Sequence, residues 1–72
     1  MVNIAKLRGK MAEKGYTINK LAKEIGMNKA TLYRKFAAEG DTFTIGEAGA
    51  IAETLALGAT EAQEIFFAIG VA

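Results

Sequence analysis

The side chains best suited to chemistry lie on one short predicted helix, over residues 29–37. Leu32 and Phe36 are four residues apart and share the face that is expected to pack inward. The rest of the helix surface carries small, polar and cationic side chains: Lys29, Ala30, Thr31, Tyr33 and Arg34. Cationic groups bind phosphates and base edges, and a small residue lets a helix sit deep in a groove. This pattern predicts a helix with one side in a core and the other side against a nucleic acid.

A second short helix is predicted directly before it, over residues 18–25. Its apolar residues recur at i, i+3, i+4 and i+7, which is the spacing of one buried stripe: Ile18, Leu21, Ala22 and Ile25. Gly26 follows immediately and suits the left-handed conformation at which a helix can stop abruptly. Asn28 is a favourable N-cap for the next helix. The sequence therefore predicts two short helices joined by a tight turn.

This pair resembles the helix-turn-helix of the phage repressor/Cro-like (XRE-type) family of DNA-binding domains. The matching residues are Leu21-Ala22, then Gly26 four residues after the alanine, then Leu32 six residues after the glycine. A small Ala22 lets the helices cross closely, Gly26 makes the turn, and Leu32 locks the second helix onto the core. The resemblance covers nearly the whole chain. It implies an all-α, compact five-helix domain of lambda-repressor-like type, with a helix-turn-helix formed by helices 2 and 3.

The resemblance also implies that the third helix enters the major groove of double-stranded DNA. The base-reading positions of the family correspond to Lys29, Ala30, Tyr33 and Arg34. Arg34 is the strongest candidate, because a guanidinium can donate two hydrogen bonds to guanine O6 and N7. The sequence supports a second role for Tyr33 equally well, as an aromatic residue half-buried at the edge of the domain.

Contacts to the DNA backbone are expected from Thr17, Asn19, Asn28, Thr31 and Lys35. The family often has a glutamine at the first position of the second helix, where this chain has Ile18. The isoleucine cannot make that phosphate contact, and Thr17 and Asn19 are the available substitutes. Two alternatives stay open, because Asn28 could act as a cap only and Lys35 could be a solvated charge.

Charge is segregated along the chain. Residues 1–36 hold all nine Lys and Arg with two acids, a net +7, whereas residues 37–72 hold six acids and no base, a net −6. A solvated surface usually mixes its signs, so the split favours a phosphate-binding face around the helix-turn-helix. The alternative is that the charge split has no function and that these side chains simply lie on a solvated surface. Glu39 and Asp41 lie in the loop after the motif, where many relatives carry basic residues, and predict a smaller DNA footprint or weaker non-specific binding than is usual for the family.

Three further helices are predicted, over residues 4–14, 45–57 and 61–69. Thr44 and Glu47 form a capping box that starts the second of these, and Gly58 is its expected C-cap. Thr60 and Gln63 form another capping box at the start of the third. The residues expected to face inward from the first two are Ile4, Leu7, Met11, Ala12, Ile45, Ala48, Ile51, Ala52 and Leu55.

The apolar end of the chain holds the candidate dimer contacts Phe67, Ile69 and Val71. Exposed apolar groups often mark partner surfaces, and a symmetric dimer suits an operator with two half-sites about one DNA turn apart. The alternative is a terminus that packs on its own domain.

Composition bounds the remaining possibilities. We expect one domain over residues 1–72, because a chain of this length forms one small core. The absence of Cys and His removes a disulfide framework and the usual zinc ligands. No motif suggests an enzyme, a metal site, a cofactor, a small-molecule ligand or a membrane span, and the expected localisation is cytoplasmic and nucleoid-associated.

These observations predict a sequence-specific regulator of transcription that binds double-stranded DNA as a homodimer, of phage repressor/Cro-like type. The alternative is a protein-interaction module that has the helix-turn-helix shape and does not bind DNA.

Overall fold

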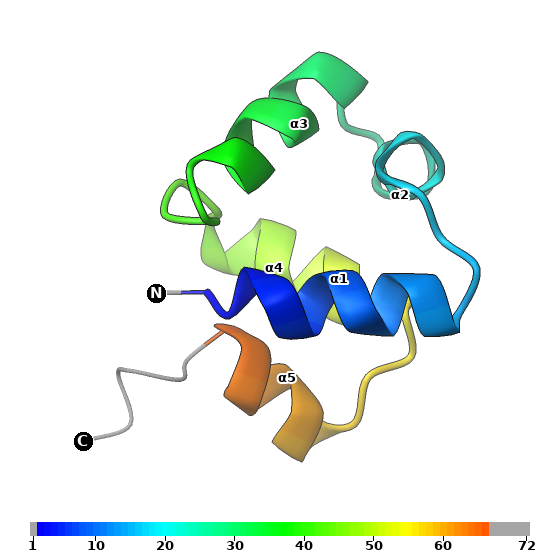
Figure 1. Cartoon of the computed structure of the whole chain (residues 1–72), viewed down its shortest axis with the longest axis vertical. Coiled ribbons are helices and arrows are strands. Elements are labelled where there is room, and N and C mark those ends of the chain that lie inside the picture. Colours follow the sequence, from blue (N-terminus) through cyan, green and yellow to red (C-terminus); the bar gives the residue numbers. More distant parts are fainter. Residues whose placement is uncertain (1, 67–72) are drawn as a thin grey trace.

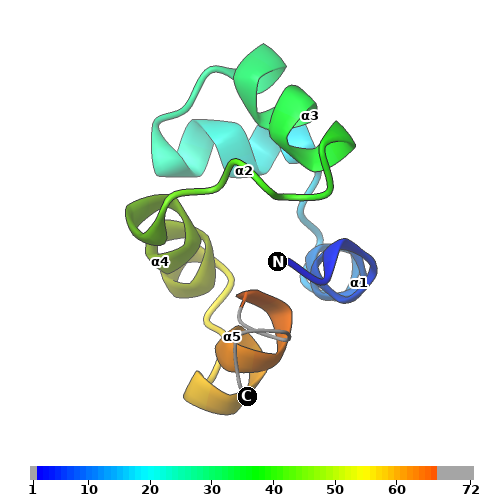
Figure 2. The same ribbon diagram turned by 90° about the vertical axis from the view of Figure 1, so that its left-hand side faces the viewer.

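The structure is a computed structural model that describes residues 2–66. It contains five helices, α1 (Ile4–Glu13), α2 (Ile18–Ile25), α3 (Lys29–Ala37), α4 (Ile45–Thr54) and α5 (Ala59–Phe66). Figures 1 and 2 show α1 and α4 across the middle of the molecule, with α2 and α3 at one end and α5 at the opposite end. The predicted all-α class, the order of the five helices and the short helix pair are confirmed.

The boundaries of α2 and α3 are set by the residues that the sequence indicated. The Thr17 side chain accepts a hydrogen bond from the Lys20 N–H at 3.1 Å and caps α2. Gly26 ends α2 in the left-handed conformation, with φ of 73°. The Asn28 side chain then accepts from the N–H groups of Ala30 and Thr31, at 2.8 and 3.3 Å. These bonds satisfy backbone donors that a helix start leaves free.

One apolar core joins all five helices. Its buried residues are Leu7, Met11, Ile18, Leu21, Ala22, Leu32, Phe36, Ala48, Ile51, Leu55, Ile65 and Phe66. Two residues predicted to face inward are exposed, Ala12 and Ile45. Ala12 lies 100° around α1 from Met11 and so falls outside the stripe. Ile45 is 83% exposed because its neighbours along α4 and α5, among them Gly49 and Ala62, are too small to cover it.

The turn between α4 and α5 comes earlier than the sequence suggested. α4 ends at Thr54 instead of Leu57, and the chain reverses at Ala56, which has φ of 54°. The early turn lets Leu55 lie fully in the core and Leu57 pack against its edge. Its closing bond is donated by the Leu57 N–H to the Ala52 carbonyl oxygen at 2.9 Å.

The start of α5 also differs from the prediction, because it begins at Ala59 instead of Glu61. The carboxylate of Glu61 accepts a hydrogen bond from the Gly58 N–H at 3.3 Å, so Glu61 supplies the side-chain cap where Thr60 and Gln63 were expected to. The predicted end of this helix at Ile69 lies outside the described residues. No helix within residues 2–66 is long and apolar enough to cross a membrane.

Candidate nucleic-acid interface

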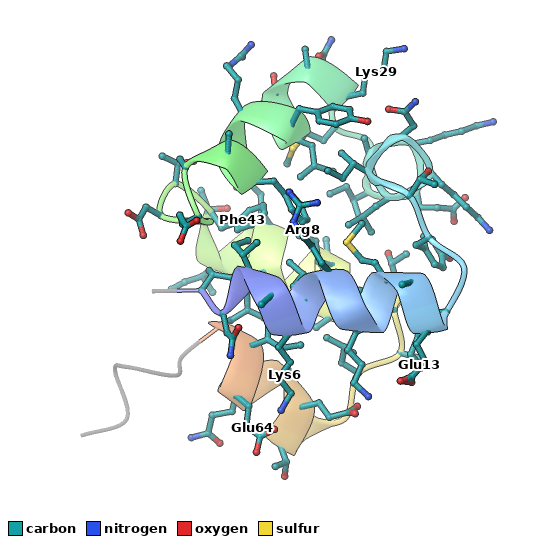
Figure 3. All side chains as sticks on the ribbon, in the orientation of Figure 1. Lys6, Arg8, Glu13, Lys29, Phe43 and Glu64 are labelled. Carbon is teal, nitrogen blue, oxygen red and sulfur yellow. The ribbon has the colours of Figure 1, made fainter. Side chains whose placement is uncertain are left out.

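α3 has a buried side and an open side. Leu32 and Phe36 are almost completely buried, at 0% and 2% exposure. The four predicted base-reading residues all lie on the exposed part of the helix: Lys29, Ala30, Tyr33 and Arg34. Tyr33 is 51% exposed, so about half of its side chain is open to solvent. Lys29 stands at the outer end of the helix in Figure 3.

The buried side of α3 packs against residues from α1, α2 and the loop before α4. Ala22 is 1% exposed in the buried cluster that joins α2 to α3, as expected for a residue at a close helix crossing. The Phe36 ring packs edge-on against Phe43, with centroids 5.8 Å apart. The Arg8 guanidinium lies 5.1 Å from the centroid of the same ring, and Figure 3 shows this side chain reaching from α1 toward α3. The inner side of α3 is thus held by the apolar core and by the Arg8 guanidinium against the Phe36 ring.

Arg8 was not singled out from the sequence. It lies 28 positions before Phe36, and no local spacing rule connects residues that far apart. Only the packing of α1 beside α3 brings the guanidinium to the ring.

The candidate backbone contacts cluster around the starts of α2 and α3. Thr17 and Asn28 are the helix caps, and Asn19 is exposed at the second position of α2. Thr31 is half-buried, and its hydroxyl accepts a hydrogen bond from Arg34 Nη2 at 3.3 Å. That bond lays the arginine along one flank of α3.

Lys35 is the predicted backbone contact that the structure places apart from the others. Its ammonium forms an ion pair with the Glu47 carboxylate at 3.2 Å and donates to the Thr42 carbonyl oxygen at 2.8 Å. Its side chain is 16% exposed. Lys35 therefore faces α4 and the loop before it, and the solvated charge considered from the sequence is not what the structure shows.

Ion pairs change the interpretation of the charge split. Lys6 pairs with Glu64 and Lys10 pairs with Glu61, which joins α1 to α5 at the end of the molecule remote from α3 (Figures 1 and 3). The hydrogen bond to Lys10 is the main reason that the pKa of Glu61 lies below its ordinary value. The same bond is the main reason that the pKa of Lys10 is raised. Part of the charge segregation along the sequence therefore supplies ion pairs between its basic and its acidic half.

Six cations form no ion pair within residues 2–66: Arg8, Lys14, Lys20, Lys23, Lys29 and Arg34. Four of the six belong to α2 and α3. The ammonium of Lys20 lies 4.6 Å from the centroid of the Tyr16 ring, beside the start of α2. The expectation that all nine cations gather around the motif was wrong, and the smaller set does lie largely on the motif.

An exposed cationic helix, held across a second helix by a glycine turn, defines a helix-turn-helix DNA-binding domain. The sequence model of the helix-turn-helix domain of resolvase matches residues 4–39, and the chain belongs to this family. The matched range contains α1, α2 and α3 and every predicted DNA contact. The match does not single out the phage repressor/Cro-like group that the sequence resembled.

Neither the curated proteins nor the solved structures gave a match. The predicted dimer contacts Phe67, Ile69 and Val71 lie outside the described residues.

Proposed function

We propose that this chain is a sequence-specific, double-stranded DNA-binding regulator of transcription, of phage repressor/Cro-like type, that inserts α3 into the major groove. The observation that carries the proposal is the division of α3 into two sides. Leu32 and Phe36 fix the helix to the core, and Arg34 and Ala30 stand on the opposite, exposed side. A helix anchored in this way presents its outer residues at the depth of base edges.

Each of the four base-reading candidates on α3 has its own proposed role. Arg34 donates two hydrogen bonds to a guanine, and Lys29 reaches a guanine or a phosphate at the start of the helix. The Ala30 methyl group contacts a thymine methyl group and lets the helix approach closely. Tyr33 bonds a phosphate or stacks at the wall of the groove.

The starts of α2 and α3 are the proposed phosphate sites. The first turns of both helices lack an acidic residue, so their positive dipole ends meet no negative side chain from their own helix. Phosphates bind well at such helix starts. Thr17, Asn19, Asn28 and Thr31 surround these positions and are the proposed side-chain contacts.

The remaining parts of the proposal concern assembly and context. The chain acts as one domain over residues 1–72 and has no enzymatic activity. It binds as a homodimer through Phe67, Ile69 and Val71 on an operator with two half-sites, and it works in the cytoplasm on the nucleoid. A DNA sequence selected from a random pool that is a two-fold repeat would support the dimer.

The decisive experiment is duplex binding as a function of salt, followed by substitution of Arg34. A groove reader loses affinity steeply as salt rises. Arg34→Ala should weaken binding to the selected sequence by about 1–3 kcal/mol. Arg34→Lys is the matched control, because it keeps the charge and loses the planar fork that pairs with guanine. It should bind random duplex like the original chain and discriminate poorly.

The second candidate function is a protein-interaction module that does not bind DNA. The observation that favours it is the exposed pair Glu39 and Asp41 in the loop after α3, where negative charge would face a nearby phosphate. Failure of the chain to bind any duplex at low salt would leave this alternative standing.

A further inference from the structure

An ion pair joins the last turn of α3 to the first turn of α4. The Lys35 ammonium lies 3.2 Å from Glu47 Oε1, and the two side chains are 16% and 26% exposed. The same oxygen accepts a hydrogen bond from the Thr44 N–H at 2.9 Å, and the Glu47 N–H donates to the Thr44 hydroxyl at 3.0 Å. The capping box of α4 therefore fixes the carboxylate in place, independently of the lysine.

The position of Lys35 on α3 matters for DNA binding. It directly follows Arg34, and it lies four residues after Thr31, so Thr31 and Lys35 are neighbours on one flank of the helix. Thr31 is one of the proposed phosphate contacts. A lysine side chain released from α4 is long and flexible enough to reach the phosphates beside that flank. In the structure its ammonium is instead directed to Glu47 and to the Thr42 carbonyl oxygen.

We propose that Glu47 withholds Lys35 from the DNA backbone and so limits the sequence-independent part of the binding affinity. This inference rests on the proposed function. A phosphate contact strengthens binding to every sequence alike, whereas base contacts strengthen binding to one. Holding one cation away from the phosphates therefore lowers the affinity for every duplex by the same factor, and the discrimination that Arg34 supplies is unchanged.

Two further observations fit this role. The pKa of Glu47 lies below its ordinary value, chiefly because its carboxylate accepts the Thr44 backbone hydrogen bond and further because Lys35 is adjacent. The carboxylate is therefore charged at neutral pH. The nearby acidic residues Glu39 and Asp41 also oppose the approach of a phosphate to this loop, so the whole region after α3 disfavours sequence-independent binding.

The test is Glu47→Gln, measured on a random duplex and on the selected sequence across a range of salt concentrations. Glutamine keeps the size of the side chain and an oxygen for the Thr44 N–H, and it removes the charge that holds Lys35. We expect the slope of log affinity against log salt to steepen by about 0.9 on random duplex. Between about 50 and 200 mM salt the variant should then lose about 3.5-fold more affinity than the original chain. Its affinity for the selected sequence should rise by the same factor as its affinity for random duplex, so the ratio of the two should stay unchanged.

Three companion variants make the result specific. Glu53→Gln makes the same change in net charge on an exposed residue of α4 and should leave the slope unchanged. Lys35→Met should also leave the slope unchanged, because the lysine contacts no phosphate in the original chain. The double variant Lys35→Met, Glu47→Gln should return to the original slope. Thermal unfolding of each variant confirms that the bound species is folded.

The possible failures are distinguishable. An original chain that binds no duplex at low salt overturns the proposed function and this inference together. An original chain that binds with a salt-dependent slope, while Glu47→Gln matches Glu53→Gln, overturns the withholding role alone. A slope that becomes shallower by about 0.9 in Lys35→Met shows that Lys35 already contacts a phosphate, and this also overturns it.

Discussion

The starts of α2 and α3 differ from the starts of α4 and α5 in the charge that they carry. α4 and α5 each have a glutamate in the first turn, Glu47 and Glu61, and each carboxylate also accepts a backbone N–H bond. The first turns of α2 and α3 contain lysines, Lys20 and Lys29, and no acid. Because the positive end of a helix dipole favours an anion, α4 and α5 supply their own. The first turns of α2 and α3, like that of α1, hold no acid, so an anion at these helix starts would have to come from elsewhere, as the proposed phosphate contacts at α2 and α3 require.

The largest expected effect comes from a substitution in the aromatic packing that connects α3 to α5. Phe36 of α3 packs edge-on against Phe43, and Phe43 packs edge-on against Phe66 of α5. Phe36→Ala should cost about 3–5 kcal/mol of unfolding free energy, because a large cavity would open between the two regions. Total stability is about 5–15 kcal/mol for typical domains, so this variant should lose a large share of its stability.

Urea unfolding followed by circular dichroism measures this loss. Tyr33→Ala is the matched control, since Tyr33 is exposed on the other side of the same helix. It should change the unfolding free energy by no more than about 0.5 kcal/mol. Equal losses for the two variants would show that α3 is not anchored by its inner side.

The turns of the two helix pairs provide the next test. Gly26 and Ala56 both have positive φ, of 73° and 54°, but only the first is a glycine. Gly26→Ala should destabilise the chain by about 1–2 kcal/mol, the cost of a left-handed alanine. Ala56→Gly should stabilise it by about 0.5–1 kcal/mol, because relief of that strain exceeds the added entropy of the unfolded chain. Melting temperatures that move in the same direction for both substitutions would contradict this account.

A smaller effect compares two lysines at opposite ends of helices. Lys29 begins α3, where a cation opposes the dipole, whereas Lys10 lies in the last turn of α1 and pairs with Glu61. Lys29→Met should raise the unfolding free energy by about 0.3–1 kcal/mol. The same change should make the salt slope of duplex binding shallower by about 0.9 if Lys29 contacts a phosphate.

Lys10→Met is the control and should behave in the opposite way. It should lower the melting temperature, because it removes the partner of Glu61, and it should leave the salt slope unchanged. A Lys29→Met variant that unfolds more easily and binds duplex as before would contradict the proposal that the start of α3 binds a phosphate.

The sequence predicted the local features well, because capping and periodicity depend on neighbouring residues. Asn28 and Gly26 set the helix-turn-helix boundaries through bonds and angles within a few residues of themselves. The charge split was harder to interpret, because the partner of Lys10 is 51 positions away in the sequence. The turn at Ala56 was missed for a related reason. Burial of Leu55 and packing of Leu57 against the core place the turn there, and glycine preference alone had favoured Gly58.

The smallest expected effect is the pH dependence of stability, which should come from the acids of α4 and α5. The pKa values of Glu47 and Glu61 are lowered in the folded chain. The folded state therefore binds fewer protons than the unfolded state, and the free energy of unfolding decreases as the pH is lowered. The contribution is full above the unfolded-state pKa of about 4.3 and is lost as the pH falls through the lower folded-state values.

The raised pKa of Lys10 acts at the other extreme. Its contribution to stability is full below the unfolded-state pKa of about 10.4 and is lost as the pH rises through the folded-state pKa.

Melting temperatures from about pH 3 to pH 7 should fall on acidification in the original chain and fall less in Glu61→Gln. Arg34→Ala is the control, because it removes a charge from the α2–α3 region and should keep the full dependence. An equally flat profile for Arg34→Ala would mean that the titrating groups are not confined to α4 and α5, and the contrast between the two helix pairs would not hold.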